Sequence, residues 1–291
     1  MNRDLVIGIS LLAVLLFFAL IGPHLPFVDT EFADGRMRFL EDGTFERAPF
    51  PPSEKDLLGT DREGRDILSL IILGIKETLY FMFAVTLLKY VLSIPLGFMA
   101  RKGKGVFYSF LSTWGSVMSG LPILIMGIIL FKTNLFSMLD NRFFLIVLSV
   151  SLLEIGRVGM VFQQLSHKVS TEPYIEAALT IGTKPLGLFK NHYIPALVPE
   201  ILVNFMLDLG RMALLIGQLG VFQVYLHFKV ELMADIPIVN NSFNLGSLLG
   251  GTKNEVIRAP WIPLFPALAI TYIIFTFNML GSGIRKKIIN Q

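Results

Sequence analysis

The chain has 291 residues, of which 53% are hydrophobic and only 16% are charged. Soluble domains carry about 25% charged residues, and the mean hydropathy of this chain is +0.65. A globule of this size cannot enclose so much apolar surface, so the composition predicts a protein whose solvent is lipid. The formal net charge of +3 is small and scattered, which argues against a nucleic-acid-binding protein.

The residue inventory also argues against an enzyme. There is no cysteine, which excludes disulfides, thiolate metal sites and cysteine nucleophiles. The histidines are far apart and lack the spacing of metal ligands: they are His24, His167, His192 and His227. We therefore expect neither a metal site nor a catalytic residue.

A phosphate-binding loop is missing as well. The stretch from Gly97 to Gly103-Lys104 is one residue too long for such a loop, and Gly105 stands where Ser or Thr is needed. We expect no cofactor in this chain, and any ATP that drives it is bound by a partner.

Apolar stretches predict an all-α membrane protein with six transmembrane helices. The first, Leu5–Ile21, follows Arg3 and is not followed by a small-x-small cleavage site. We therefore expect a retained helix with a cytoplasmic N-terminus, rather than a signal peptide. The other five are Thr78–Met99, Val106–Phe131, Phe143–Phe162, Leu197–Val224 and Trp261–Ile284, with Trp261 placed where an interfacial aromatic belongs.

The distribution of basic residues orients these helices. Segments 1–4, 101–106, 163–196 and 285–291, proposed to be cytoplasmic, hold 10 Lys and Arg in 51 residues. The proposed outer segments 22–70, 132–142 and 225–260 hold 11 in 96 residues. The positive-inside rule then predicts a multi-pass protein with both termini in the cytoplasm.

The chain divides into three parts on this reading. Residues 1–21 form the N-terminal tail and first helix, 22–77 an extracytoplasmic segment, and 78–291 the core with five helices. Residues 22–70 have a net charge of −5, which fits an outward-facing polar segment.

The cytoplasmic segment 163–196 is too long for a simple turn and predicts two short helices. Thr171 would cap the first, which has Pro173 in its first turn. Gly182 would end it in the left-handed conformation. A second helix would restart at Lys184-Pro185 and stop at Ile194-Pro195.

One face of the first short helix is nearly flat. Ala177 and Ala178 would let a partner approach closely, with Glu176 as a charged contact at the edge and Tyr174 in the same helix. The alternative, an ordinary amphipathic loop at the membrane surface, stays equally open.

A second motif precedes the second predicted span. In residues 59–66, Thr60 and Glu63 have the spacing of a capping box, which predicts the start of an interfacial helix. The motif either shapes an outward mouth or only anchors a turn. The spacing of its acidic residues does not follow that of a calcium loop.

Charges within the spans need partners, because lipid does not solvate them. Glu154 with Arg157, and Asp208 with Arg211, are each spaced i,i+3 and would meet on one helix face. We favour a structural role for both pairs over one in lining a solute path.

Three stretches, in this order, resemble the permeases of bacterial oligopeptide, dipeptide and nickel ABC importers. Gly59-Thr60-Asp61, Gly64-Arg65-Asp66 and Ser69 resemble the GTDxxGRDxxS signature of that family. Glu176-Ala177-Ala178, Gly182 and Ile194-Pro195 resemble its EAA loop. Ala259-Pro260-Trp261 and Phe277 to Arg285 resemble its last helix. The long acidic segment after the first span resembles the C-type partner of the two permeases.

The resemblance implies a type I ABC-importer permease fold in the bacterial inner membrane. This subunit would form half of a pathway for peptides, nickel complexes or other small solutes, completed by a homologous permease. Two cytoplasmic ATPases would dock on residues 163–196 and on the counterpart of this segment in the second permease, and an extracytoplasmic binding protein would deliver the solute. The alternatives are an ion-coupled secondary transporter that uses the intramembrane charges, and a membrane-embedded enzyme, for which no metal or nucleophile constellation exists.

Overall fold

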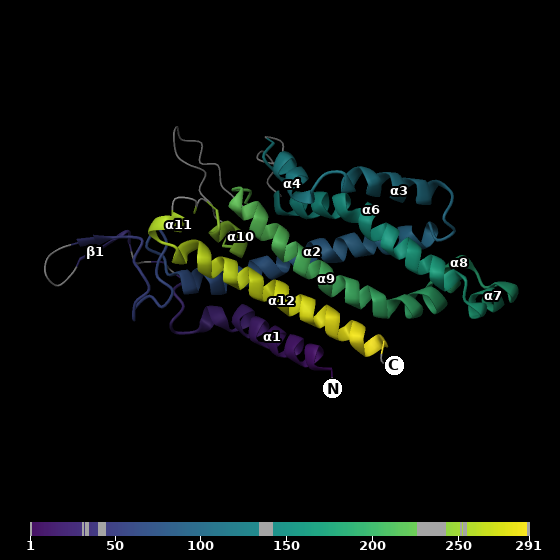
Figure 1. Cartoon of the computed structure of the whole chain (residues 1–291), viewed down its shortest axis with the longest axis horizontal. Coiled ribbons are helices and arrows are strands. Elements are labelled where there is room, and N and C mark those ends of the chain that lie inside the picture. Colours follow the sequence, from purple (N-terminus) through teal and green to yellow (C-terminus); the bar gives the residue numbers. More distant parts are fainter. Residues whose placement is uncertain are drawn as a thin grey trace.

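The computed structural model describes residues 2–30, 32, 35–39, 45–133, 142–225, 243–250, 252 and 255–289. Within them, long helices run side by side in an elongated bundle (Figure 1). They are α1 (Arg3–Leu20), α2 (Ile67–Met99), α3 (Val106–Ser119), α4 (Ile123–Phe131), α6 (Arg142–Ser170), α9 (Ile194–Val221) and α12 (Trp261–Ile289).

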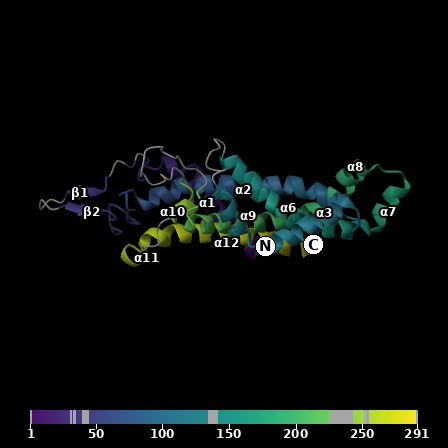
Figure 2. The same ribbon diagram turned by 90° about the horizontal axis from the view of Figure 1, so that it is seen from above.

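Short elements gather at the two ends of the bundle. One end carries η1 (Gly22–His24), the antiparallel hairpin of β1 (Met37–Phe39) and β2 (Phe45–Arg47), α10 (Leu245–Leu248) and α11 (Glu255–Arg258). The other end carries α7 (Pro173–Thr180) and α8 (Pro185–Leu188), and η2 (Phe189–Tyr193) joins α8 to α9. Figures 1 and 2 both show these two groups at opposite ends of the long axis.

Helix α2 is the centre of the bundle. Of its most apolar window, 61% is buried inside the protein, against 17% for α1, which lies at the periphery. It begins earlier than the predicted Thr78, because the Asp66 carboxylate caps it by accepting from the Ser69 N–H at 2.8 Å. The Glu77 carboxylate, which lies within α2, accepts from the Phe243 N–H at 3.0 Å.

The third predicted span, Val106–Phe131, consists of two helices instead of one, and its crossing of the membrane stays a prediction. Helices α3 and α4 meet at an angle of 84°. The break follows Gly120, and Pro122 is extended, with ψ 131°. Because Pro122 has no N–H to continue the helical ladder, the chain turns here instead of crossing directly.

Four helices of the described chain are long and apolar enough to span a membrane, or five if the bent pair of α3 and α4 counts as one. They are α1, α2, α6 and α12. The predicted fifth span is the 28-residue helix α9, which carries Glu200, Asp208 and Arg211. At 1.5 Å per residue it is roughly 42 Å long, more than a bilayer core of about 30 Å needs. The protein is an all-α membrane protein, and six spans remain a prediction.

The two chain ends lie close together, in the half of the molecule that contains α7 but well short of α7 itself (Figure 1). Asn2 Nδ2 donates to the carbonyl of Gly283 at 2.7 Å, and Lys286 forms an ion pair with Asp4. These contacts hold α1 against α12, so the two termini share one side of the bundle.

Glycines allow the helix backbones to touch. A Cβ on Gly156 of α6 would lie 2.4 Å from the backbone nitrogen of Gly115 in α3. One on Gly220 of α9 would lie 1.7 Å from the carbonyl oxygen of Gly246 in α10. Such close approach is typical of helix packing in membranes. The hydrophobic effect does not drive helices together there, and small residues allow the close van der Waals packing that does.

We expect Gly156→Ala to destabilise the bundle by about 1–3 kcal/mol, because the methyl group forces α3 away from α6. Gly187→Ala is the matched control, since its Cβ would meet only Thr183 Cγ2, at 3.4 Å. Thermal unfolding of the detergent-purified protein measures the difference. Equal stability of the two variants would contradict the close α3–α6 contact.

Candidate functional site: a buried charge network and the loops at the two ends of the bundle

A lysine lies at the centre of the charged residues in the bundle. Lys89 of α2 is fully buried, with a side-chain exposure of 0%. Its Nζ lies 3.3 Å from Glu154 Oε2 of α6 and 3.2 Å from Asp208 Oδ2 of α9. One ammonium group therefore joins three helices.

The two predicted i,i+3 pairs exist, but they are parts of one network. Arg157 donates to Glu154 through Nε at 3.2 Å and also contacts Asp208, with 3.1 Å between Nη2 and Oδ1. Arg211 Nη1 lies 2.8 Å from the same Asp208 oxygen. The sequence interpretation left Lys89 out of the site. The signal was present, because a lysine within an apolar span needs a partner.

The network also includes a tyrosine. The hydroxyl of Tyr90 donates to Asp208 Oδ2 at 3.1 Å, so Asp208 accepts from residues of all three helices. Among the described residues, no group of three or more acidic or histidine side chains is placed to hold a metal ion. His227 lies outside the described residues.

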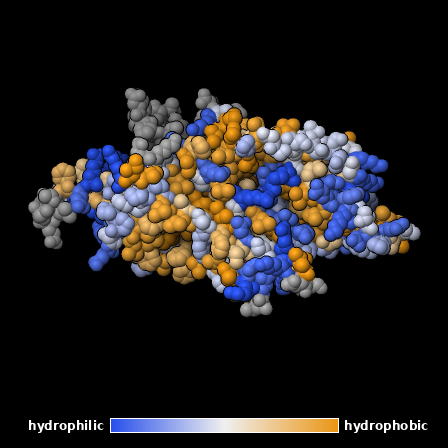
Figure 3. Space-filling view, in the orientation of Figure 1, coloured by the Kyte–Doolittle hydropathy of each residue, from blue (hydrophilic) through white to orange (hydrophobic). Residues whose placement is uncertain are grey.

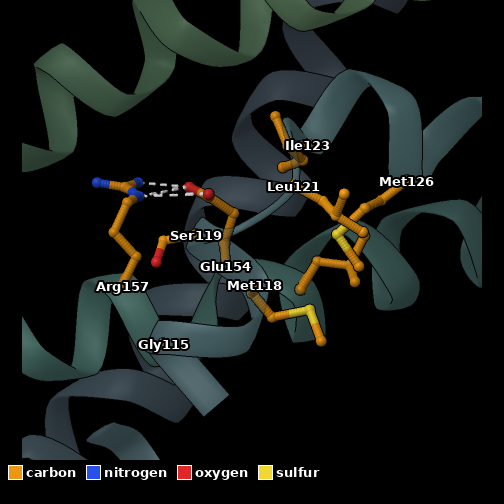
Figure 4. Close-up of a pocket in the computed structure, with 9 residues that line it drawn as sticks. Gly115, Met118, Ser119, Leu121, Ile123, Met126, Glu154 and Arg157 are labelled. Carbon is orange, nitrogen blue, oxygen red and sulfur yellow. Dashed lines mark hydrogen bonds and ion pairs between the residues drawn. The ribbon is translucent and has the colours of Figure 1, made fainter. Parts of the chain in front are cut away.

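The anions are buried, whereas the guanidinium groups reach the surface. Side-chain exposure is 4% for Asp208 and 13% for Glu154, but 38% for Arg157 and 56% for Arg211. Two hollows, of about 180 and 340 Å³, meet along Glu154 and Arg157. Figure 4 shows the smaller one, with the ion pair on one side and Met118, Leu121 and Met126 on the other.

The loop at one end of the bundle contains the predicted left-handed turn. Gly182 has φ +80°, and the N–H groups of Thr183 and Gly182 donate to the carbonyls of Ala178 and Leu179 at 3.1 and 3.0 Å. These two bonds are those of a Schellman motif, which ends α7. The predicted cap was wrong: α7 begins after Glu172, and the Thr171 hydroxyl donates backward to Lys168 in α6.

The two alanines of this loop face opposite ways, which corrects the predicted flat face. Ala178 is buried in a cluster with Phe98, Ile175, Tyr193 and Leu197, so it packs within this chain. Ala177 is exposed, together with Glu176. The outer surface of the loop is instead apolar at its tip, where Ile181 is 83% and Leu186 78% exposed, next to half-exposed Tyr174 and Leu179.

Ile194-Pro195 does not end a helix, contrary to the prediction. Residues Phe189–Tyr193 form a π-helical turn that continues directly into α9. Pro195 has no N–H to donate to the preceding turn. That turn is wider than an α-helical one, with a hydrogen bond from the Ile194 N–H to the Phe189 carbonyl, and it lets the helix continue past the proline. The loop is thus joined without a break to α9.

The loop is also held against α2. The Arg101 guanidinium lies 4.2 Å above the Phe98 ring and 5.7 Å from the ring of Tyr193 in η2. The Arg101 carbonyl lies 2.9 Å from Nδ1 of His167, near the end of α6. Three helices therefore hold the base of the loop.

At the opposite end, the glycine-rich motif folds as a compact turn. The Asp61 carboxylate accepts from the N–H groups of Glu63 and Arg65 at 2.9 Å, and from Arg65 Nε at 2.7 Å. Gly59 and Gly64 have φ of +75° and +82°, which favour glycine. Burial and the neighbouring Asp61 raise the pKa of the Glu63 carboxyl above its ordinary value.

The predicted capping box in this motif was wrong. Thr60 Oγ1 accepts from the Phe50 N–H at 2.8 Å instead of capping a helix, and the helix begins only after Asp66. The Nε1–H of Trp261 donates to the Thr60 carbonyl at 3.2 Å, and Arg62 pairs with Glu255. The motif thus joins the start of α2 to the start of α12.

Comparison with known proteins identifies the family. Residues 93–289 match the family described as the inner membrane component of binding-protein-dependent transport systems. The match covers more than half of the chain. This chain belongs to that family.

Individual relatives are permease proteins of peptide-type systems. The chain is 23% identical to the dipeptide transport system permease protein DppC of Haemophilus influenzae, over 98% of this chain and 89% of that protein. It is 23% identical to the glutathione transport system permease protein GsiD of Pectobacterium atrosepticum, over 83% and 74% of the two chains. It is 24% identical to the probable D,D-dipeptide transport system permease protein DdpC of Escherichia coli, over 81% and 73%.

Membership of this family makes the chain a non-catalytic membrane permease of an ABC importer. The expected multi-pass membrane protein is confirmed. The alternative of an ion-coupled secondary transporter finds no support in these relatives.

Asp208→Asn should destabilise the permease by about 3–5 kcal/mol, because it leaves the buried Lys89 with one partner fewer. Adding Lys89→Met should recover most of that loss. Arg211→Gln alone should cost less than about 1 kcal/mol, since this side chain is largely exposed. The readout is thermal unfolding in detergent together with the yield of monodisperse protein. If Arg211→Gln compensates Asp208→Asn better than Lys89→Met does, the central role of the lysine is refuted.

Proposed function

We propose that this permease imports peptides or similar small solutes and forms half of the translocation pathway, the other half coming from a homologous permease. The relatives named for dipeptide and glutathione transport support the solute class. The observation that carries the proposal is the separation of the glycine-rich motif of residues 59–66 and the loop of residues 173–193 to opposite ends of one bundle (Figure 1). A machine that couples events on two sides of a membrane needs such an arrangement.

The loop from Pro173 to Tyr193 is the proposed docking element for two cytoplasmic ATPases, one on each permease. Its exposed Leu179, Ile181 and Leu186 offer an apolar surface at the tip, and Glu176 adds a charge beside it. Helix α6 leads into the loop, and the end of the loop continues into α9 without a break. A displacement of the loop is therefore transmitted to these helices.

The motif from Gly59 to Asp66 is the proposed frame of the outward mouth, beneath an extracytoplasmic binding protein. Its side chains Thr60, Asp61 and Asp66 accept hydrogen bonds from backbone N–H groups of this chain, those of Phe50, Arg65 and Ser69. We therefore assign it the task of fixing the starts of α2 and α12, and not of contacting solute.

The proposed topology has six spans in a bacterial inner membrane, with both termini and the Pro173–Tyr193 loop in the cytoplasm. It is supported by the basic clusters 101–104 and 285–287. In Figure 1 the two termini lie in the same half of the molecule as this loop, which agrees with it.

The absence of native cysteine allows a clean test of this topology. Position Thr44, which the sequence suggested for labelling, lies outside the described residues, so the exposed Glu54 replaces it. An impermeant thiol reagent added to whole cells should label Glu54→Cys and spare Lys184→Cys. Permeabilised cells, in which both variants should react, are the control. The opposite pattern in whole cells would invalidate the orientation.

Variants of the loop test ATPase docking. We expect Ala177→Phe and Gly182→Val to reach normal membrane levels but to lose ATPase co-purification and solute uptake. The first places bulk on the exposed face of α7, and the second penalises the left-handed turn by roughly 1–2 kcal/mol.

Ala178→Phe is the contrasting control, because its ring has to enter the cluster around Phe98. It should lower the abundance of the permease itself. Normal ATPase retention and uptake in both Ala177→Phe and Gly182→Val would exclude the loop as the docking element.

A further inference from the structure

We propose that Arg157 and Arg211 form a subsite that binds the carboxylate group of the transported solute. The inference rests on the proposed function, since it concerns the pathway of the same permease. It assigns to the charge network a role beyond holding three helices together.

The charge balance of the network favours an anion. Lys89, Arg157 and Arg211 supply three positive charges, whereas Glu154 and Asp208 supply two negative ones. Lys89 is fully buried and its Nζ lies between both carboxylates, so it does not reach a ligand. The excess positive charge is therefore presented by the two guanidinium groups.

The position of these groups excludes lipid as their neighbour. Arg211 lies in the middle of α9, and Figure 3 shows hydrophilic surface next to hydrophobic surface near the middle of this face. A guanidinium exposed to hydrocarbon costs several kcal/mol, so charged side chains in spans face a partner or a water-filled path. With 56% of its side chain exposed, Arg211 must face one of these.

The guanidinium groups have donors to spare. Arginine has five N–H donors in a fork that matches a carboxylate. In the described part of the chain, the one ion pair of Arg211 is with Asp208, through Nη1. Both arginines line the hollow of about 340 Å³, which also contains the side chain of Gln218.

A second hollow adjoins this one, and its far side is apolar. Met118, Leu121 and Met126 line the space of about 180 Å³ on the far side of Glu154 (Figure 4). Methionine side chains adapt to ligands of different shape. A solute that has a carboxylate beside an apolar group, as a peptide C-terminus does, fits the pair of hollows.

The test uses the assembled importer in proteoliposomes, with its binding protein outside and ATP inside. The probes are one tripeptide with a free C-terminal carboxylate and the same tripeptide as its amide. Affinity of the binding protein for each is measured separately, and uptake is compared at equal saturation of the binding protein. The wild-type permease should take up the free acid faster than the amide.

Arg211→Gln should lower uptake of the acid by about tenfold, the loss expected for one charge-assisted hydrogen bond. It should leave uptake of the amide within about twofold. Arg211→Lys keeps the charge and should retain most of the preference for the acid. Arg3→Gln, an exposed arginine in α1, is the control that should change neither rate.

Three results would distinguish failure of the carboxylate subsite from failure of the proposed function. Equal loss of acid and amide uptake in Arg211→Gln, with normal assembly and ATPase activity, would overturn the carboxylate subsite but leave the permease function intact. Unchanged uptake of both peptides in that variant would overturn it as well. Absence of any ATP-dependent uptake by the wild-type assembly would instead count against the proposed function.

Discussion

The buried positive charge of Lys89 is the constraint on which the arrangement of the bundle depends. An ammonium in the interior is tolerated only where carboxylates reach it, and its two partners come from α6 and α9. The three helices that carry the network must therefore cross at one place. Glycine contacts such as that of Gly156 with Gly115 then bring α3 onto α6. Hydrophobic packing completes the bundle, but it does not select this crossing, because lipid tails are as apolar as the helix faces.

The same helices connect the network to the end of the bundle. Helix α6 passes from Glu154 and Arg157 to the start of the loop, and α9 passes from the end of the loop to Asp208. The π-helical turn from Phe189 to Tyr193 keeps this second connection helical in spite of Pro195. Thr171 and Glu172 separate α6 from α7, so the continuous helical connection is the one on the α9 side, and a displacement of the loop reaches α9 directly. A shift of α9 would change the distances from Asp208 to Lys89 of α2 and to Arg157 of α6.

Sequence reasoning succeeded where the cause is local. The left-handed turn at Gly182 follows from one residue and its neighbours, and the structure confirms it. Reasoning failed where distant parts of the chain decide. Thr60 does not cap a helix, because its hydroxyl accepts from the Phe50 N–H and its carbonyl accepts from the Trp261 Nε1–H. Ala178 is buried, because Phe98 of another helix packs on it, and no pattern within residues 173–180 reveals that.

The surfaces that a single chain leaves exposed indicate what an assembly has to cover. Ile181 and Leu186 project apolar side chains from the tip of the loop, away from the described bundle. Arg211 presents charge at mid-height, where neither lipid nor the apolar face of a neighbouring helix would accommodate it. The first surface needs an apolar partner and the second needs water, an anion or an acidic one. One permease chain satisfies neither need, and the opposite chemistry of the two surfaces indicates that different neighbours cover them.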